Sequence, residues 1–506
     1  MYESRHYRPP YTEPKQPNRL MYPFFGLLAF CLFVTTSLSM RTTIPHRNES
    51  PSLRLDEPPA PKLSSDHVPY LPRFGNVEEK QYAGLVTVNA AEGNIFYWFF
   101  ESRVNPLSRD TPLIVWLNGG PGASSMTGLL TEMGPYRMNA DGTMSSHPHS
   151  WTNLGHMLFF DQPVGTGYTS AKNESGYVNS QLEMAEQLYI ALTSFYDLHP
   201  EYAMNRVVIA GESYAGKYVP HIAHYIHEMN QKKSEKKTSI NLWGVAIGNG
   251  EMKPLVQTMT VADYALSLGL IDKEQFDQHR QSLEKCASLV QEGKLVDAFG
   301  VCQRTEDEVH FWCWRVLTLH EQIYREAGNP FIYDIRQQGN AFTALTLTLS
   351  KYFNLPETRE ALNIPPNTLW TSIDGSSYGD DPTAPAIARH LLNDEMVDVS
   401  DEILETLMNK YHVLYYAGNM DGSSCNHLGM SRVVDQLKWN GAEEFHRATR
   451  HPWKVNGDSV GGLAKEGGNV AVVVITNSGH LVPTDQPEAS LEMMRRFLTQ
   501  RSFALP

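Results

Sequence analysis

One short segment constrains the fold of this chain more than any other: residues 207–216, with the sequence VVIAGESYAG. An apolar run of the strand type leads into a turn around Ser213, and apolar residues at helical spacing follow. The small residues Gly211 and Ala215 flank the serine, as a strained turn with close neighbours requires. This strand–turn–helix pattern is typical of a nucleophile elbow, although the last small residue is more often Gly than Ala. The alternative is a serine in an ordinary strand–helix turn.

Apolar runs that suit buried strands recur along the rest of the chain. The predicted strands are 83–88, 94–101, 112–118, 156–161, 206–210, 242–247, 413–417 and 471–476, and helical periodicity marks 181–196 and 488–499. Strands that alternate with helices favour a mostly parallel sheet. Between about 252 and 410 the strand signal fades, which predicts a helical cap inserted into the sheet.

A serine nucleophile needs a base, and the base needs a carboxylate that orients it. Asp421 follows the predicted strand 413–417, and His480 follows the strand 471–476. Open α/β sheets place their sites at the carboxyl ends of parallel strands. A single histidine after a strand is usually a plain core or surface residue. The chain order Ser213, Asp421, His480 and these positions together predict a catalytic triad.

A glycine-rich turn, WLNGGPGASS, occupies residues 116–125 at the end of another predicted strand. Backbone N–H groups in such a turn can stabilise an oxyanion. The alternative is a tight loop without a ligand. Because the turn precedes the serine segment in chain order, we interpret it as an oxyanion loop.

The N-terminal region contains one segment long enough to cross a membrane. Residues 20–40 carry no charged side chain, and about 20 apolar residues suffice for a transmembrane helix. The basic residues within 1–19 favour a cytoplasmic leader and a lumenal remainder. We expect an uncleaved signal-anchor. A cleaved signal peptide is the alternative, since Ser37 and Ser39 fit a small-residue cleavage site.

Residues 41–75 are rich in proline, serine and charge and are predicted to form a stalk or linker, with a single folded domain over 76–506. Two Asn-x-Ser sequons, at Asn48 and Asn173, predict N-glycosylation and exposure to the lumen.

The cysteines and the net charge exclude some classes of site. Apart from Cys31 in the apolar segment, the chain has Cys286, Cys302, Cys313 and Cys425. They allow at most two disulfides in three pairings. Their spacing lacks the doubled C-x-x-C of a zinc site. The formal net charge of −14 disfavours a nucleic-acid partner. No metal or organic cofactor is implied.

Several of these segments together resemble the serine carboxypeptidase family. The matching stretches are WLNGGPGASS (116–125), DQPVGTGY (161–168), GESYAGKYVP (211–220), AGNMDGSSCNHLG (417–429) and SGHLVPTDQP (478–487). The resemblance spans about residue 82 to the C-terminus and is greatest to the vitellogenic-like branch. It implies an α/β-hydrolase fold with a mostly parallel central sheet and an inserted helical cap.

The resemblance also implies a role for each matching residue. Ser213 would be the nucleophile, His480 the general base and then acid, and Asp421 its orienting carboxylate. The backbone N–H groups of Gly120 and Tyr214 would form the oxyanion hole. The terminal carboxylate of the substrate would be bound by Asn118, Gly119 and Glu212, with Glu132 paired to Glu212.

Two further expectations follow from the resemblance. Two carboxyls in contact cannot both ionise cheaply, so the Glu132–Glu212 pair should retain a proton and peptide binding should be best at acidic pH. The family often has Cys where this chain has Ala123, so the disulfide at that position is absent and family disulfide pairings are not transferable. Cys425 is expected to be a free packed thiol.

The expected function is hydrolysis of the C-terminal bond of peptides or proteins through an acyl-enzyme, favoured at acidic pH. Three alternatives are an acyltransferase, a lipase or esterase, and a noncatalytic membrane-tethered binding protein. The enzyme would lie in the secretory pathway, anchored with a lumenal catalytic domain, or lysosomal or secreted if the N-terminal segment is cleaved. The sequence does not predict the oligomeric state.

Overall fold

The computed structural model describes residues 66–232, 239–303, 323–324, 327–328, 330–338, 341–372, 386–457 and 459–504. The predicted leader, membrane segment and sequon at Asn48 lie outside these ranges, as do residues 41–65 of the predicted linker. Within the ranges, no helix has both the length and the apolar character needed to cross a bilayer.

A ten-stranded sheet forms the centre of the domain. In sheet order its strands are β14 (His451–Lys454), β15 (Val460–Gly467), β16 (Val470–Ile475), β13 (His412–Gly418), β10 (Leu242–Gly248), β9 (Val207–Glu212), β5 (Leu113–Leu117), β8 (His156–Asp161), β4 (Asn94–Phe100) and β3 (Gln81–Thr87). The run from β16 to β8 is parallel, and the strands outside it pair antiparallel. The prediction of a mostly parallel central sheet is therefore confirmed.

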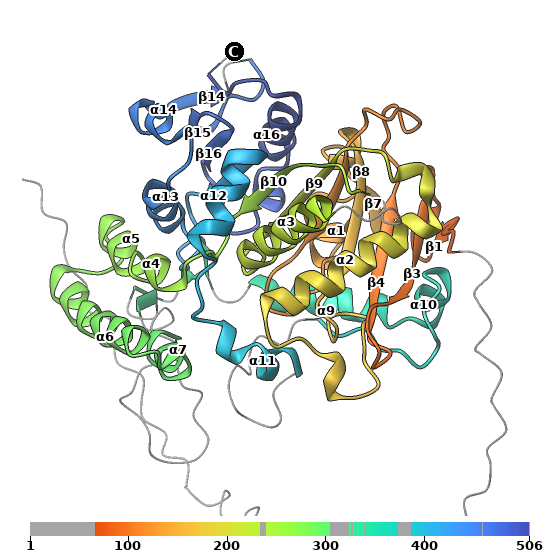
Figure 1. Ribbon diagram of the computed structural model, residues 1–506, viewed down its shortest axis with the longest axis horizontal. Helices are drawn as coiled ribbons and strands as arrows, with labels where there is room; N and C mark the ends of the chain where they lie inside the picture. The colour runs from red at the N-terminus through yellow and green to blue at the C-terminus, as the bar shows by residue number, and fades with distance from the viewer. Residues whose placement is uncertain are drawn as a thin grey trace, which may run out of the picture. The chain divides into compact units, whose positions relative to one another are not determined.

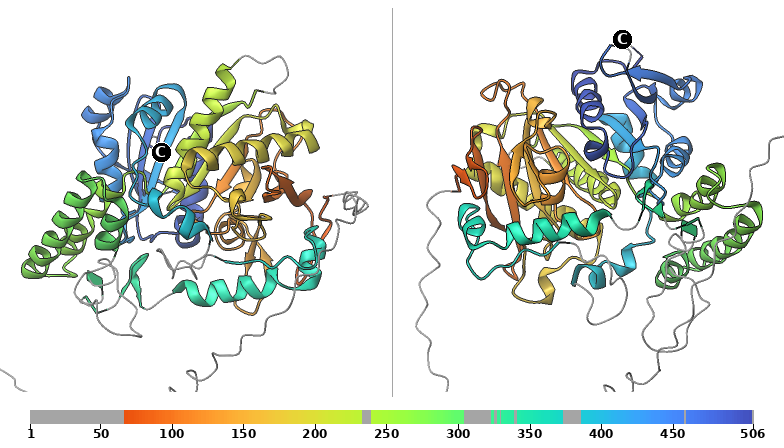
Figure 2. Two further views of the ribbon diagram at one scale, coloured as in Figure 1. Left: turned by 60° about the horizontal axis from the view of Figure 1, so that its bottom comes forward. Right: turned by 180° about the vertical axis from the view of Figure 1, so that it is seen from behind.

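Helices cover both faces of this sheet, as Figures 1 and 2 show. One hydrophobic core lies between the sheet and α2 (Gln181–Leu198), α3 (Ala215–Gln231), α12 (Asp401–Lys410), α13 (His427–Gln436) and α14 (Ala442–Arg447). A second core lies on the opposite face, under α1 (Met126–Thr131), α9 (Ala341–Phe353) and α16 (Pro487–Thr499). Every residue of β5, β8, β9 and β16 is buried, which explains why these strands are continuous apolar runs.

The segment between β10 and β13 contains the predicted cap, but the structure divides it into unlike parts. The helices α4 (Pro254–Thr258), α5 (Val261–Ser267), α6 (Lys273–Gln291) and α7 (Leu295–Gln303) have small cores of their own and lie beside the sheet (Figure 1). By contrast, α9 crosses the sheet face near β3 and β4 (Figure 2, right), followed by α10 (Pro356–Ala361). The helix α12, predicted as the end of the cap, packs against α3 and β13 because Leu404, Leu407 and Met408 enter the main core.

One disulfide joins Cys286 of α6 to Cys302 of α7, a pairing that the sequence left open. Cys425 is buried and free, as expected. Cys31 and Cys313 lie outside the described ranges.

The folded domain begins earlier than the sequence predicted. Val68 and Leu71 are fully buried, and a short hairpin forms from β1 (Tyr70–Leu71) and β2 (Gly75–Asn76). Residues 66–75, expected to belong to the linker, are thus part of the domain. The prolines and charged residues of this segment gave it the composition of a linker. The two apolar side chains that pack into the core were therefore not recognised.

Candidate active site

Ser213 occupies a strained turn between β9 and α3. Its φ of 64° lies in the left-handed region, which a non-glycine residue adopts only where the surroundings enforce it. The Ser213 N–H donates to the carbonyl oxygens of Gly248 (3.1 Å) and Asn249 (3.2 Å), and its own carbonyl accepts from the N–H of Glu251 (2.9 Å). The segment after β10 therefore holds the backbone of the predicted elbow.

Asp421 and His480, predicted from the order of the motifs, are in contact. The Nδ1 atom of His480 lies 2.6 Å from Oδ2 of Asp421, and both residues are buried. Asp421 also accepts hydrogen bonds from the Asn249 side-chain amide (2.7 Å) and from the backbone N–H of Ser423 (2.9 Å). Because the carboxylate accepts, Nδ1 of His480 carries the proton and Nε2 is left as the basic atom.

The structure places Ser213 at the same edge of the sheet as this pair. Strands β9, β13 and β16 run parallel in one sheet, so their carboxyl ends meet there. Among the described residues, Ser213 Oγ has no hydrogen-bond partner, so a Ser213–His480 bond is not formed in this structure. Catalytic hydrogen bonds are often long before substrate binds.

The glycine-rich loop after β5 lies against the elbow. A β-carbon on Gly119 would come within 2.4 Å of the Tyr214 nitrogen and 2.8 Å of Ser213 Cβ, so only glycine permits this approach. Within the described part of the chain, the backbone N–H groups of Gly120 and Tyr214 have no acceptor in the protein. Two unsatisfied donors beside the serine suit a developing oxyanion.

Asp161, a residue to which the sequence assigned no role, fixes this loop from the end of β8. Its carboxylate accepts from the hydroxyl of Ser124 (2.5 Å) and the backbone N–H groups of Ser125 (3.1 Å) and Tyr168 (3.2 Å). Burial raises its pKa to about 7. The sequence signal that could have indicated a role for Asp161 is its position directly after the apolar run 156–160.

Asn118, Glu132 and Glu212 form a buried cluster beside the nucleophile. The Asn118 side-chain nitrogen donates to Glu212 Oε1 (2.8 Å) and lies 3.5 Å from Glu132 Oε1. Its oxygen accepts from the Trp116 indole (2.8 Å) and the Gly128 N–H (3.1 Å), which fixes the orientation of the amide. The structure thus brings together three residues that span 94 positions of the sequence.

Both glutamates have raised pKa values. Burial raises the pKa of Glu132 to about 7, against the opposing effect of hydrogen bonds with Glu212 and Asn118. Burial, followed by the charge of Glu132, raises the pKa of Glu212 well above its ordinary range. At acidic pH the pair therefore retains protons and can donate a hydrogen bond.

Tyr333, from the turn between β11 (Pro330–Phe331) and β12 (Asp334–Gln338), also contacts the candidate base. Its carbonyl accepts the backbone N–H of His480 (2.7 Å), and the two rings are 4.8 Å apart. Arg336 fixes this hairpin by pairing with Asp334 (2.7 Å) and Asp485 (2.9 Å). No sequence pattern predicts this contact, because the hairpin is short and lies within the insertion.

In the described ranges, no group of three or more His, Cys, Asp or Glu side chains is arranged to hold a metal ion.

Comparisons with known proteins point to one family. The profile of the serine carboxypeptidase family matches residues 72–500. A probable serine carboxypeptidase CPVL of Mus musculus is 33% identical over 440 residues, covering 85% of each chain. The venom serine carboxypeptidase of Apis mellifera is 30% identical over 424 residues, covering 83% of this chain and 85% of that one.

A solved structure shows the same fold. The prohormone-processing carboxypeptidase Kex1 of Saccharomyces cerevisiae superposes with a TM-score of 0.68 at 24% identity, covering 83% of this chain and 92% of that one. The α/β-hydrolase fold and the resemblance to the vitellogenic-like branch are both confirmed. The chain belongs to the serine carboxypeptidase family.

Proposed function

We propose that this chain removes the C-terminal residue of peptides or proteins through an acyl-enzyme on Ser213, with best activity at acidic pH. The cluster of Asn118, Glu132 and Glu212 carries the proposal, because Glu212 immediately precedes the nucleophile. An amide and a protonated carboxyl can both donate to a substrate carboxylate. A lipase or esterase site has no use for two buried glutamates at this position.

In the proposed first step, Ser213 Oγ attacks the carbonyl carbon of the last peptide bond and its proton passes to Nε2 of His480. Asp421 stabilises the resulting imidazolium through Nδ1. The carbonyl electron pair moves to oxygen, and the N–H groups of Gly120 and Tyr214 stabilise that oxyanion. Collapse of the tetrahedral intermediate breaks the C–N bond, and His480 gives its proton to the departing amine.

In the second step, water takes the place of the amine. His480 removes a proton from the water, whose oxygen attacks the Ser213 ester, and the proton then returns to Ser213 Oγ as the ester bond breaks. The products are a shortened peptide with a new carboxylate and the free C-terminal amino acid.

The raised pKa values of the glutamates set the direction of the pH dependence. Below about 7 the pair retains protons and donates to the substrate carboxylate. Above that range Glu132 ionises, and its negative charge in a buried site repels the substrate carboxylate. Substrate binding should therefore weaken as the pH rises through about 7.

A secretory location fits two observations. The Cys286–Cys302 disulfide is typical of oxidising compartments. Asn173 is exposed, and its side-chain oxygen accepts from the N–H (3.1 Å) and hydroxyl (2.7 Å) of Ser175. The sequon at Asn173 is thus accessible for glycosylation. The membrane anchor at 20–40 remains part of the proposal.

The test compares an N-blocked dipeptide as its free acid with the same dipeptide as its C-terminal amide. The proposal predicts that the free acid has the higher kcat/KM at about pH 5, and that its advantage shrinks toward about pH 8 as the glutamates ionise. Equal rates for acid and amide at every pH would contradict carboxylate recognition. Transfer of the acyl group to an added alcohol in preference to water would favour the acyltransferase instead.

A further inference from the structure

The insertion between β10 and β13 contacts Tyr214 through a buried side chain, that of Asp394 in η5 (Leu392–Asp394). Its Oδ2 accepts from the hydroxyl of Tyr214 (2.7 Å) and from the side-chain amide of Gln181 (2.6 Å). All three side chains are buried. Tyr214 is the residue whose backbone N–H is the second proposed oxyanion donor, so Asp394 restrains the side chain of that donor.

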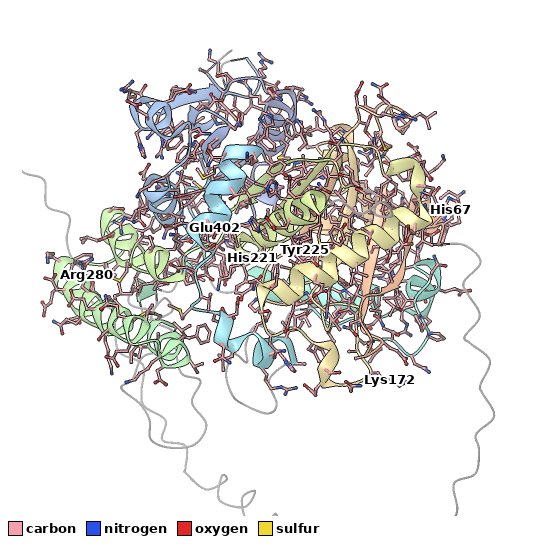
Figure 3. All side chains as sticks on the ribbon, viewed as in Figure 1. His67, Lys172, His221, Tyr225, Arg280 and Glu402 are labelled. Atoms are coloured by element: carbon pink, nitrogen blue, oxygen red, sulfur yellow. A yellow bond between two sulfur atoms is a disulfide. The ribbon has the colours of Figure 1, made fainter. Side chains whose placement is uncertain are left out.

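A buried lysine binds the same segment from α3. Lys217 is 1% exposed, and its ammonium donates to the backbone oxygens of Asp394 (2.5 Å) and Glu395 (2.9 Å). The ammonium lies 3.7 Å from Asp394 Oδ2 and 4.8 Å from the centre of the Tyr214 ring. One turn further along α3, His221, labelled in Figure 3, contacts the Lys217 carbonyl through Nδ1 (2.7 Å).

The same segment contacts the other side of the oxyanion hole. Ile387, in α11 (Ala386–His390), lies so close to Gly122 that a β-carbon there would come within 3.0 Å of Ile387 Cδ1. Gly122 is two residues after Gly120, the first proposed donor. Residues 386–395 therefore touch the loops that carry both N–H groups.

The far side of η5 is supported by the disulfide-linked helices. Leu392 and Met396, which flank Asp394, pack in one cluster with Cys286 and Cys302. A carboxylate held between this cluster and α3 has little freedom to move, since protein interiors are close-packed.

We propose that Asp394 is a positioning residue for the oxyanion hole, which fixes the Tyr214 N–H by holding the Tyr214 side chain through the Tyr214–Asp394–Lys217 network. This inference rests on the proposed function, because it assigns Asp394 a role in the same acyl transfer. It predicts that loss of the link weakens stabilisation of the transition state and leaves binding of the substrate ground state unchanged.

The test uses Asp394→Asn and Tyr214→Phe, singly and combined. Tyr214→Phe keeps the ring and the backbone N–H and removes only the hydroxyl. Each single variant should lower kcat about tenfold with little change in KM, because a misplacement of about 1 Å can cost roughly 100-fold and the loss of one link should move the N–H by less. The double variant should lose no more than the worse single variant, since both break one link.

Two inhibitors separate positioning from a general loss of structure. A peptide aldehyde forms a hemiacetal with Ser213 and places its oxygen in the hole, whereas the released C-terminal amino acid product, which binds on the leaving-group side, does not. The inhibition constant of the aldehyde should rise about as much as kcat falls, and that of the product should stay constant. Asp401→Asn makes the same chemical change elsewhere and is the control, since Asp401, the first residue of α12, pairs with Lys253 before α4 and contacts neither proposed donor.

The outcomes are distinct. Unchanged kcat and aldehyde affinity in Tyr214→Phe would overturn the inference, as would an equal loss of aldehyde and product affinity. If Asp394→Asn does not fold, Tyr214→Phe alone decides. A wild-type protein without peptidase activity would instead contradict the proposed function.

Discussion

At the scale of single residues, the site depends on a few buried polar groups that hydrogen-bond to one another. Asn249 shows this most simply. Its amide nitrogen donates to Asp421 Oδ2 (2.7 Å), and its oxygen accepts the N–H of Gly418 (3.1 Å). It therefore links the end of β10 to the carboxylate that orients His480.

We predict that Asn249→Ala lowers both kcat and stability. Removing the amide leaves a buried carboxylate short of one donor, which costs about 1–3 kcal/mol in unfolding free energy. Denaturant unfolding and dipeptide hydrolysis measure the two effects. Asn205→Ala is the control, because Asn205 is an equally buried amide that donates to Thr111 O (2.7 Å) at the opposite end of β9. A similar loss of kcat in both variants would contradict a specific role for Asn249.

The glutamate pair predicts a pH dependence of stability with a definite sign. The native pKa of Glu132, about 7, lies above its ordinary value of 4.5, so the native state holds this proton more tightly than the unfolded chain does. The stabilisation that this proton provides is fully present below pH 4.5 and is lost as the pH rises through about 7.

The unfolding free energy of the wild type should therefore decrease as the pH rises. We predict that Glu132→Gln reduces this slope by up to about 1.4 kcal/mol per pH unit. Denaturant unfolding at pH values between 4.5 and about 7 measures this slope. Some slope should remain, since Asp161 also has a pKa raised to about 7. An unchanged slope in the variant would show that Glu132 does not carry the proton.

At the scale of secondary structure elements, the apolar runs were the most predictable part of the fold. The eight predicted strands correspond to β3, β4, β5, β8, β9, β10, β13 and β16. A strand buried on both faces leaves a continuous apolar signal, whereas the edge strand β3 is buried only in part. The strand β15 was missed, since Val460–Gly467 contains three glycines and two charged residues. Strand β15 forms through its antiparallel pairing with β16, although its own sequence does not favour a strand.

The disulfide-linked pair α6–α7 gives a prediction at this scale. Replacing Cys286 and Cys302 together by serine should lower the unfolding free energy by about 3 kcal/mol, as expected for a closed loop of roughly 15 residues. Thermal unfolding under non-reducing conditions measures this loss. Because the disulfide cluster packs on Leu392 and Met396, kcat should fall as well. Equal stability with and without the disulfide would contradict a structural role for it.

At the scale of the whole molecule, the sequence predicted the sheet and the motif residues but not how the insertion contributes to the site. The motifs at 116–125, 211–220, 417–429 and 478–487 end or follow strands, so the sheet topology brings them together. Tyr333 and Asp394 could not be predicted in this way. They lie on short elements whose positions are set by tertiary contacts with His480 and Tyr214, and no periodic pattern marks them.

The buried cluster of Asn118, Glu132 and Glu212 illustrates the same limit. Its members could be named from the resemblance alone, but their raised pKa values follow from complete burial, which depends on packing across β5, β9 and α1. The proposed acidic preference therefore depends on the folded domain and not on any one motif.

The most direct test of the account is release of leucine from benzyloxycarbonyl-Phe-Leu at about pH 5 by the wild-type protein and by Ser213→Ala. The account predicts release by the wild type, and a loss of several orders of magnitude in kcat in the variant with an unchanged thermal unfolding curve. Equal release by both proteins, or none by a folded wild type, would contradict Ser213 as the nucleophile of a carboxypeptidase.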